Sequence, residues 1–220
     1  VPVGSSKNAK THLQYAVDFA KAFGAKLYVV QIYNVYTKAG TMINVDQIIE
    51  RESKDFLDNH VASIETKGVE IYTRTLKGKL VDTLEKVCDA IDVDLIILEP
   101  RTNSIKDEVY LGKTSGKIIK QTQIPALIVP EGYVYKPIVK ILLAVKSAIV
   151  KKEGVLDPLS AFKNQFKAVV NVLLVKTSHH IKEDFVFNDE LKGMITNTTI
   201  AESPTTFQAV LEHYKSNYPD

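Results

Sequence analysis

The part of the sequence that constrains the fold most lies between residues 94 and 130. It holds two short apolar runs, at residues 95–98 and 126–129, and each is bounded by acidic residues or prolines. Runs of this length between turn residues are typical of strands buried on both faces of a parallel sheet. The sequence therefore predicts an α/β domain in this region.

A helix start lies between the two runs, where Gly112 is followed by Lys113, Thr114 and Ser115. The amino end of a helix that follows the carboxyl end of a parallel strand is a favourable place for a phosphate, because its free amides and its dipole attract anions. We therefore expect residues 112–115 to be able to hold an anion.

The remainder of residues 1–135 alternates between strand patterns and helical patterns. Residues 1–3 are interpreted as the tail of a strand, strand patterns follow at 27–32 and 70–76, and helical patterns occupy 9–20, 48–64 and 80–91. The order β-α-β-α-β-α-β-α-β predicts a doubly wound, parallel five-stranded sheet with helices on both faces. Ser5 or Ser6 is expected to cap the first helix, and Gly24 to end it. The inner side of the second helix is predicted to carry Ile48, Ile49, Phe56, Leu57, His60, Val61 and Ile64.

The strand, loop, helix start and final strand between 94 and 130 resemble the universal stress protein family. Domains of that family carry a loop of the form G-x2-G-x9-G-(S/T/N) at this place, and Gly112 matches its third glycine. The resemblance implies a Rossmann-like fold of the adenine nucleotide alpha hydrolase type. It also implies that ATP or AMP is the ligand to consider, at the carboxyl ends of strands one and four.

Several positions depart from the family's nucleotide-binding pattern. Glu99 and Thr102 stand where the other two glycines are expected, Lys113 stands in place of a small hydroxyl or amide residue, and Gly4 replaces the aspartate that follows the first strand. The sequence therefore predicts the family's frame with a degenerate nucleotide site. The candidate ligand-binding residues are Gly4, Ser5, Thr102, Gly112, Lys113, Thr114 and Ser115.

An internal repeat follows the first 135 residues. Residues 141–147 align with the first strand, 169–175 with the second, and 203–220 lie without gaps on 77–94. We expect a stress protein domain at 1–135 and a partial second copy at 136–220, with a Tyr-rich hinge at 133–137. Because the second copy stops where its fourth strand would begin, we expect the chain to be a fragment of a longer tandem protein.

Composition limits the functional classes. The 220 residues carry a formal net charge of +2 with lysines scattered among acids, so no nucleic-acid footprint stands out. The single cysteine, Cys88, lies on an apolar helical stripe and is interpreted as a buried small side chain. No run is long enough to span a membrane. These features predict a cytoplasmic protein that binds neither nucleic acid nor membrane.

Catalytic and metal-binding patterns find no support in the sequence. The string from Gly112 to Ser115 imitates the end of a Walker A loop, but Asp107 occupies the position of that motif's first glycine. His179 and His180 are adjacent without a completing ligand, and His60 lies in a helical pattern. We therefore expect no catalytic and no metal-binding residues. Tyr33, Tyr36, Tyr133 and Tyr135 could line an adenine pocket, form an interdomain seam, or pack linkers over the sheet ends.

Three functions remain open. The preferred one is a regulatory or protective stress-response module that is not an enzyme and acts through dimerisation and contacts with an unidentified protein partner. The resemblance implies a homodimer or an intramolecular pseudo-dimer, with residues 126–129 as the pairing edge. The alternative is an ATP- or AMP-binding stress protein with at most weak hydrolysis, and the third is an adenine nucleotide hydrolase.

Overall fold

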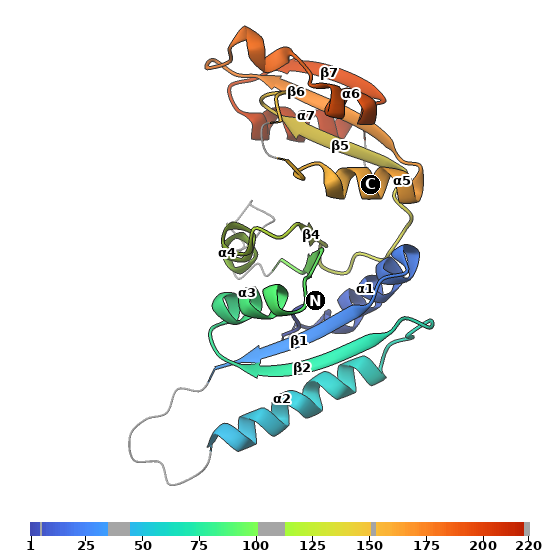
Figure 1. The fold of residues 1–220 in the computed structure, drawn as a ribbon, viewed down its shortest axis with the longest axis vertical. Helices are drawn as coiled ribbons and strands as arrows, with labels where there is room; N and C mark the ends of the chain where they lie inside the picture. The colour runs from blue at the N-terminus through green and yellow to red at the C-terminus, as the bar shows by residue number, and fades with distance from the viewer. Residues whose placement is uncertain (5, 35–44, 101–112, 151–152, 218–220) are drawn as a thin grey trace. The chain divides into compact units, whose positions relative to one another are not determined.

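The computed structural model describes residues 1–4, 6–34, 45–100, 113–150 and 153–217. The chain divides into two compact units, Val1–Tyr135 and Lys136–Asp220 (Figure 1). No helix in the described ranges combines the length and the apolar character needed to cross a membrane.

Helices and strands alternate along the first unit, and its strands pair in parallel. β1 pairs with β2, and β3 pairs with β4. This confirms the predicted α/β fold with parallel strands and helices. The elements are α1 (Ala9–Phe23), β1 (Leu27–Tyr33), α2 (Val45–Ala62), β2 (Ile71–Lys77), α3 (Leu80–Ala90), β3 (Ile96–Leu98), α4 (Lys113–Thr122) and β4 (Ala126–Ile128).

The expected first strand is reduced to a short parallel contact. Pro2 forms an isolated bridge with Val30, and the amide of Val3 donates to the carbonyl of Val30 at 2.8 Å. Proline has no amide hydrogen, so Pro2 can only accept from a second neighbour and not donate to it. The described strands of the first unit form two parallel pairs, β1-β2 and β3-β4, and the count of five strands in one sheet stays a prediction.

One apolar core connects the two pairs. Val30 of β1, Ile96 and Leu98 of β3, Leu84 and Cys88 of α3, and Ile118 of α4 form a single buried cluster. All three residues of β3 are buried, as expected for a strand covered on both faces. Cys88 is a free, buried cysteine, which confirms its interpretation as a core residue.

The first helix follows its sequence pattern closely. Leu13, Ala16 and Val17 are fully buried, and Gly24 ends the helix in the left-handed conformation. The N-cap residue is Asn8, whose side chain makes no capping bond. Ser6 instead accepts a hydrogen bond from the amide of Asn8 through its hydroxyl oxygen at 3.2 Å. The prediction that a serine caps this helix is therefore wrong for Ser6, while Ser5 lies outside the described residues.

The second helix buries less than its pattern predicted. Leu57 and Ser53 are its buried residues, while Ile48 is 41% exposed. Ile64 is buried but lies beyond the helix end at Ala62. The helix packs on β1 and β2. In its first turn Gln47 and Ile48 are exposed, whereas Val45 and Asp46 are half-buried.

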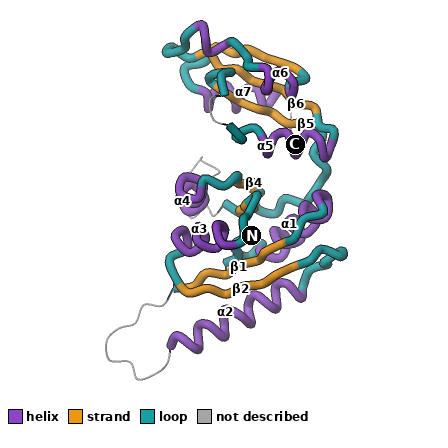
Figure 2. Tube along the Cα trace, in the orientation of Figure 1, coloured by secondary structure: helices purple, strands orange, loops and turns teal. Residues whose placement is uncertain are grey.

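The second unit contains a three-stranded parallel sheet in the order β5-β6-β7 (Figure 1), whose strands are orange in Figure 2. Leu173 and Val175 of its central strand form a buried cluster with Ala209 of the last helix. The last helix begins at Thr206, the position that the repeat alignment places on Leu80, where α3 begins. The elements are β5 (Lys140–Val145), α5 (Asp157–Phe166), β6 (Val169–Lys176), the 3-10 helix η1 (Lys182–Phe185), α6 (Asp189–Met194), β7 (Asn197–Glu202) and α7 (Thr206–Asn217).

Candidate functional site

A cavity of about 300 Å³ lies at the carboxyl ends of the strands in the first unit. Its walls come from residues 2–4, from the last residues of β1 and β3, and from the first turn of α4. In an open parallel sheet this end is where ligands bind, because the turns that leave the strands diverge there. The cavity is therefore the candidate functional site.

Three of the candidate residues line this cavity. They are Gly4, Thr114 and Ser115. Ser115 is buried, whereas Thr114 is exposed at the start of α4. Lys113 begins that helix, but its side chain, like the whole of Ser5, Thr102 and Gly112, lies outside the described residues.

Gln31 and Glu99 also line the cavity, and neither was among the candidates. Gln31 belongs to β1 and Glu99 directly follows β3. One side-chain oxygen of each is buried and accepts no hydrogen bond from any residue that the structure describes. Glu99 stood out in the sequence only as a departure from the glycine pattern. Gln31 could have been found as the lone amide side chain inside an otherwise apolar and aromatic strand.

Comparison with known families agrees with this fold. A family model described as the universal stress protein family matches residues 1–130. The chain belongs to that family.

Individual relatives of this stress protein are distant. A universal stress protein of Methanocaldococcus jannaschii is 22% identical over 134 residues, covering 59% of this chain and 79% of the relative. The crystal structure of a universal stress protein from Archaeoglobus fulgidus covers 99% of this chain and 82% of its own, with 18% identity and a TM-score of 0.76. A functionally unknown protein of Pseudomonas aeruginosa covers 100% and 76%, with 14% identity and a TM-score of 0.59. At these identities the structures establish the fold alone.

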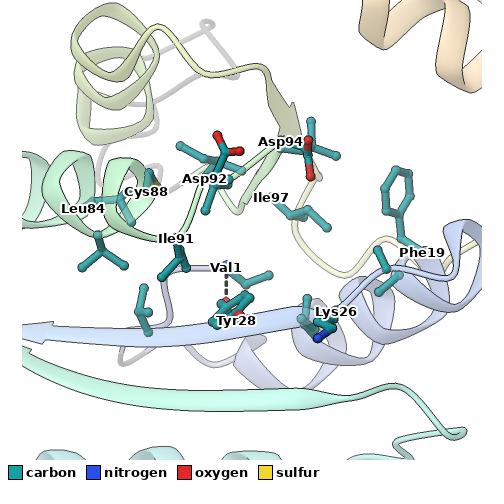
Figure 3. Close-up of a pocket in the computed structure, with 18 residues that line it drawn as sticks. Val1, Phe19, Lys26, Tyr28, Leu84, Cys88, Ile91, Asp92, Asp94 and Ile97 are labelled. Carbon is teal, nitrogen blue, oxygen red and sulfur yellow. Dashed lines mark hydrogen bonds between the residues drawn. The ribbon is translucent and has the colours of Figure 1, made fainter.

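A second cavity of this stress protein lies toward the opposite ends of β1 and β3 and has a volume of about 350 Å³ (Figure 3). Its lining is largely apolar, and the amino group of Val1 donates to the carbonyl oxygen of Tyr28 at 2.7 Å beside it. Burial raises the pKa of the Cys88 thiol there, which disfavours the reactive thiolate. Cys88, which is buried and has a raised pKa, is therefore a structural part of this cavity's wall and not a candidate nucleophile.

Two of the tyrosines considered as ligand contacts pack elsewhere. The rings of Tyr133 and Tyr135 contact Tyr15 of α1 edge-on, with centroid distances of 6.0 and 5.7 Å. Burial, followed by the two neighbouring phenols, raises the pKa of Tyr15 to about 12. Neither ring lines the carboxyl-end cavity. Their position fits the packing alternative, while Tyr36 lies outside the described residues.

The histidines occupy local, structural positions. The ring of His60 packs on Phe56 at 4.0 Å between centroids, and its Nδ1 lies 2.8 Å from the carbonyl oxygen of Phe56. His180 makes a similar contact with the carbonyl oxygen of Thr177 at 2.7 Å. Within the part of the chain that the structure describes, no three His, Cys, Asp or Glu side chains gather in a way that could hold a metal ion.

Proposed function

We propose that this protein is a regulatory binding module of the stress response, which acts by changing its contacts with partner proteins and does not turn over a substrate. One observation carries the proposal: among the described residues that line the carboxyl-end cavity, Glu99 is the only titratable side chain. A lone carboxylate can bind a ligand, but it forms neither a nucleophile–base pair nor a metal site.

Dimerisation is the second element of this proposal. β4 pairs with β3 along one edge, and its three residues are all half-buried. An apolar edge strand needs a cover, and pairing with a second copy of the chain supplies one. The unit Lys136–Asp220, as a partial second domain of the same family, is the other candidate cover and would make a pseudo-dimer. We also propose that the protein acts in the cytoplasm.

Sedimentation of the purified chain tests the dimer. We expect a homodimer that the substitution Leu127→Lys in β4 converts to monomer, because a lysine on an edge strand opposes edge-to-edge pairing. The control is Val134→Lys, since Val134 is 66% exposed and lies outside β4. A monomeric wild-type chain contradicts the homodimer and leaves the pseudo-dimer, whereas a sizeable phosphate release from ATP in the same preparation contradicts a module that does not turn over a substrate.

Binding of ATP or AMP in the carboxyl-end cavity is the second candidate function. The position of Thr114 and Ser115 at the first turn of α4 favours it, because a helix amino end attracts phosphate. A ligand at about a hundredfold excess over its Kd adds about 2.7 kcal/mol to the free energy of unfolding. A thermal melt with ATP that shows no shift would remove this candidate. An adenine nucleotide hydrolase is the least supported alternative, because the described residues that line the cavity form no catalytic constellation.

A further inference from the structure

The carboxyl-end cavity contains two hydrogen-bond acceptors to which no described residue donates. The buried oxygens are Oε1 of Gln31 and Oε1 of Glu99, and both residues line the cavity. A buried polar atom without a partner loses its bonds to water and gains nothing in return, so each such atom raises the free energy of the folded protein. The empty space beside them is where a matching donor would restore those bonds.

The sign of the charge on Glu99 restricts what that donor can be. A carboxylate repels an oxyanion, and the repulsion is larger at a buried atom than in water because less solvent screens it. At the same cavity the first turn of α4, with Thr114 and Ser115, presents the positive end of a helix. A helix amino end of this kind would favour a phosphate, whereas the carboxylate of Glu99 opposes one.

We propose that the cavity selects a small ligand that presents a hydrogen-bond donor to Glu99 and Gln31, such as a hydroxyl, an amide or an ammonium group, and that it discriminates against phosphates. The inference rests on the proposed function as a binding module and names the ligand chemistry of that module's cavity. A cavity of about 300 Å³ is at the lower end of the range for small-molecule sites, so the ligand has about the size of a nucleoside.

Glu99 acts in this scheme as a specificity determinant. Unpaired acceptors in a binding site reject a ligand that cannot satisfy them, and this kind of rejection is stronger than the loss of an apolar contact. Gln31 offers the same acceptor without the charge. Glu99 therefore makes the cavity prefer neutral or cationic ligands over anionic ones. Gln31 adds affinity for any ligand that donates a hydrogen bond, whether that ligand is neutral or cationic.

The test measures the Kd of four probes for the full chain by calorimetry: adenosine, AMP, ATP and a short alkyl diamine. We expect wild-type protein to bind adenosine or the diamine more tightly than AMP, and AMP more tightly than ATP. In Glu99→Gln the affinity for AMP rises by about tenfold, because a like charge is lost and the new amide can donate to phosphate. The diamine separates a preference for positive charge from a preference for neutral donors, since only its affinity falls when Glu99 loses its charge.

Matched variants separate this effect from a general change in the protein. Glu52→Gln makes the same chemical change on an exposed position of α2 that does not line the cavity, and we expect it to leave all four affinities unchanged. Gln31→Leu removes the uncharged acceptor and is expected to weaken adenosine without favouring AMP. A thermal melt without ligand establishes that each variant is folded.

Two outcomes overturn the inference. One is that ATP or AMP binds the wild-type chain at least as tightly as adenosine and the diamine, with Glu99→Gln making no difference. The other is that no probe binds to wild type or variants. Neither outcome alters the dimer measured by sedimentation, so the inference can fail while the proposed function stands. A monomeric chain that bound the probes in the expected order would instead support the inference and contradict the homodimer of the proposed function.

Discussion

Each unit of the molecule opens with a strand segment, a turn, a helix and a parallel strand, but the turn is open in one unit and filled in the other. In the first unit the turn at Gly4 borders the carboxyl-end cavity. In the second, the amide of Ala148 donates to the main-chain carbonyl of Asp184 in η1 at 2.7 Å, and Ala148 is fully buried. The segment that follows β6 thus folds back over the end of β5.

This difference shows which part of the chain determines whether a binding cavity is present. The strand pairs are alike, since β1 pairs in parallel with the segment at Pro2 and β6 pairs in parallel with β5. What closes the second unit is η1, a segment that the local sequence of the turn does not include. A strand-turn-helix frame therefore supplies a possible place for a ligand, and a segment distant in sequence decides whether the place is available.

The helices after the two turns also differ. α1 buries eight of its residues, including His12, whereas no residue of α5 is buried. α1 ends at Gly24 and α5 at Lys167, both in the left-handed conformation. The first unit therefore places an ionisable ring in its core, and the second places a lysine where glycine is favoured. Each contrast predicts a difference in stability that can be measured one unit at a time, by hydrogen exchange at core amides of β1 and β6.

The largest expected effect is the response of the first unit to acid. Burial, with a smaller effect from the amino group of Val1, lowers the pKa of His12 from 6.5 to about 4. The unfolded state then binds a proton that the folded state does not, so stability is complete above about pH 6.5 and is lost as the pH falls toward 4. Since His12 is only 5% exposed, we expect a loss of roughly 3 kcal/mol across this window.

Substitution of His12 by leucine isolates this term. We expect His12→Leu to flatten the pH dependence at β1 amides, while the β6 amides of the same protein keep the wild-type profile. The amino group of Val1 also titrates in this range, because burial lowers its pKa to about 5. The measured quantity is therefore the difference between variant and wild type, and an unchanged slope at β1 would show that His12 is not the responsible group.

Short apolar runs made most of the fold predictable. The runs at 95–98 and 126–129 became β3 and β4, and the stripe through Leu13 and Val17 became the buried face of α1. The period of a pattern identifies a face but does not say how much of it neighbours cover, which is why Ile48 was wrongly placed inside. Pairing also depends on partners distant in sequence, so the strand patterns alone do not say which strands are hydrogen-bonded neighbours.

The site was predictable only in part. Gly4, Thr114 and Ser115 could be placed together because turns at the carboxyl ends of parallel strands meet at one edge. Gln31 carried no motif, and its proposed role depends on a buried oxygen to which no described residue donates, which no spacing reveals. The aromatic rings at 133 and 135 were compatible with a ligand until the structure placed them against Tyr15.

The helix ends predict two smaller effects of opposite sign. At Gly24 φ is +61° and nothing lies within 4 Å of an added Cβ, so the substitution Gly24→Ala meets only the backbone penalty. We expect a loss of about 1–2 kcal/mol in the first unit. At Lys167 φ is +55°, and Lys167→Gly removes the same penalty in the second unit. The greater entropy of glycine in the unfolded chain offsets part of this gain, which leaves less than about 1 kcal/mol.

Denaturant unfolding of both variants, followed at the amides of Val30 and Leu173, measures the two changes separately. We expect Gly24→Ala to speed exchange at Val30 and to leave Leu173 unaffected, and Lys167→Gly to slow exchange at Leu173 alone. If either substitution changed both amides equally, the two units would unfold as one, and the comparison between them would lose its basis.

The smallest effect concerns the filled turn itself. The amide of Ile181 donates to Oδ2 of Asp184 at 3.1 Å, and this bond, followed by one from the hydroxyl of Ser147, lowers the pKa of Asp184 below its usual 3.8. A carboxyl whose pKa is lower in the folded state stabilises the fold at pH values above its unfolded pKa. This stabilisation is lost as the pH falls through the folded-state pKa. The second unit should therefore keep its closed turn at pH values that already weaken the first.

Asp184→Asn tests this closure without large unfolding. We expect faster hydrogen exchange at the amides of Ile181 and Ala148 and little change at Leu173, because the lost carboxylate is only half-buried and bonds to a neighbour three residues away. Glu190→Gln, an exposed neutralisation in α6, serves as the control. If a cavity opened at the end of β5 in Asp184→Asn and bound adenosine, η1 alone would account for the difference between the open turn of the first unit and the closed turn of the second. Unchanged exchange at Ala148 would instead mean that the main-chain bond to Asp184 holds the turn closed without help from the side chain.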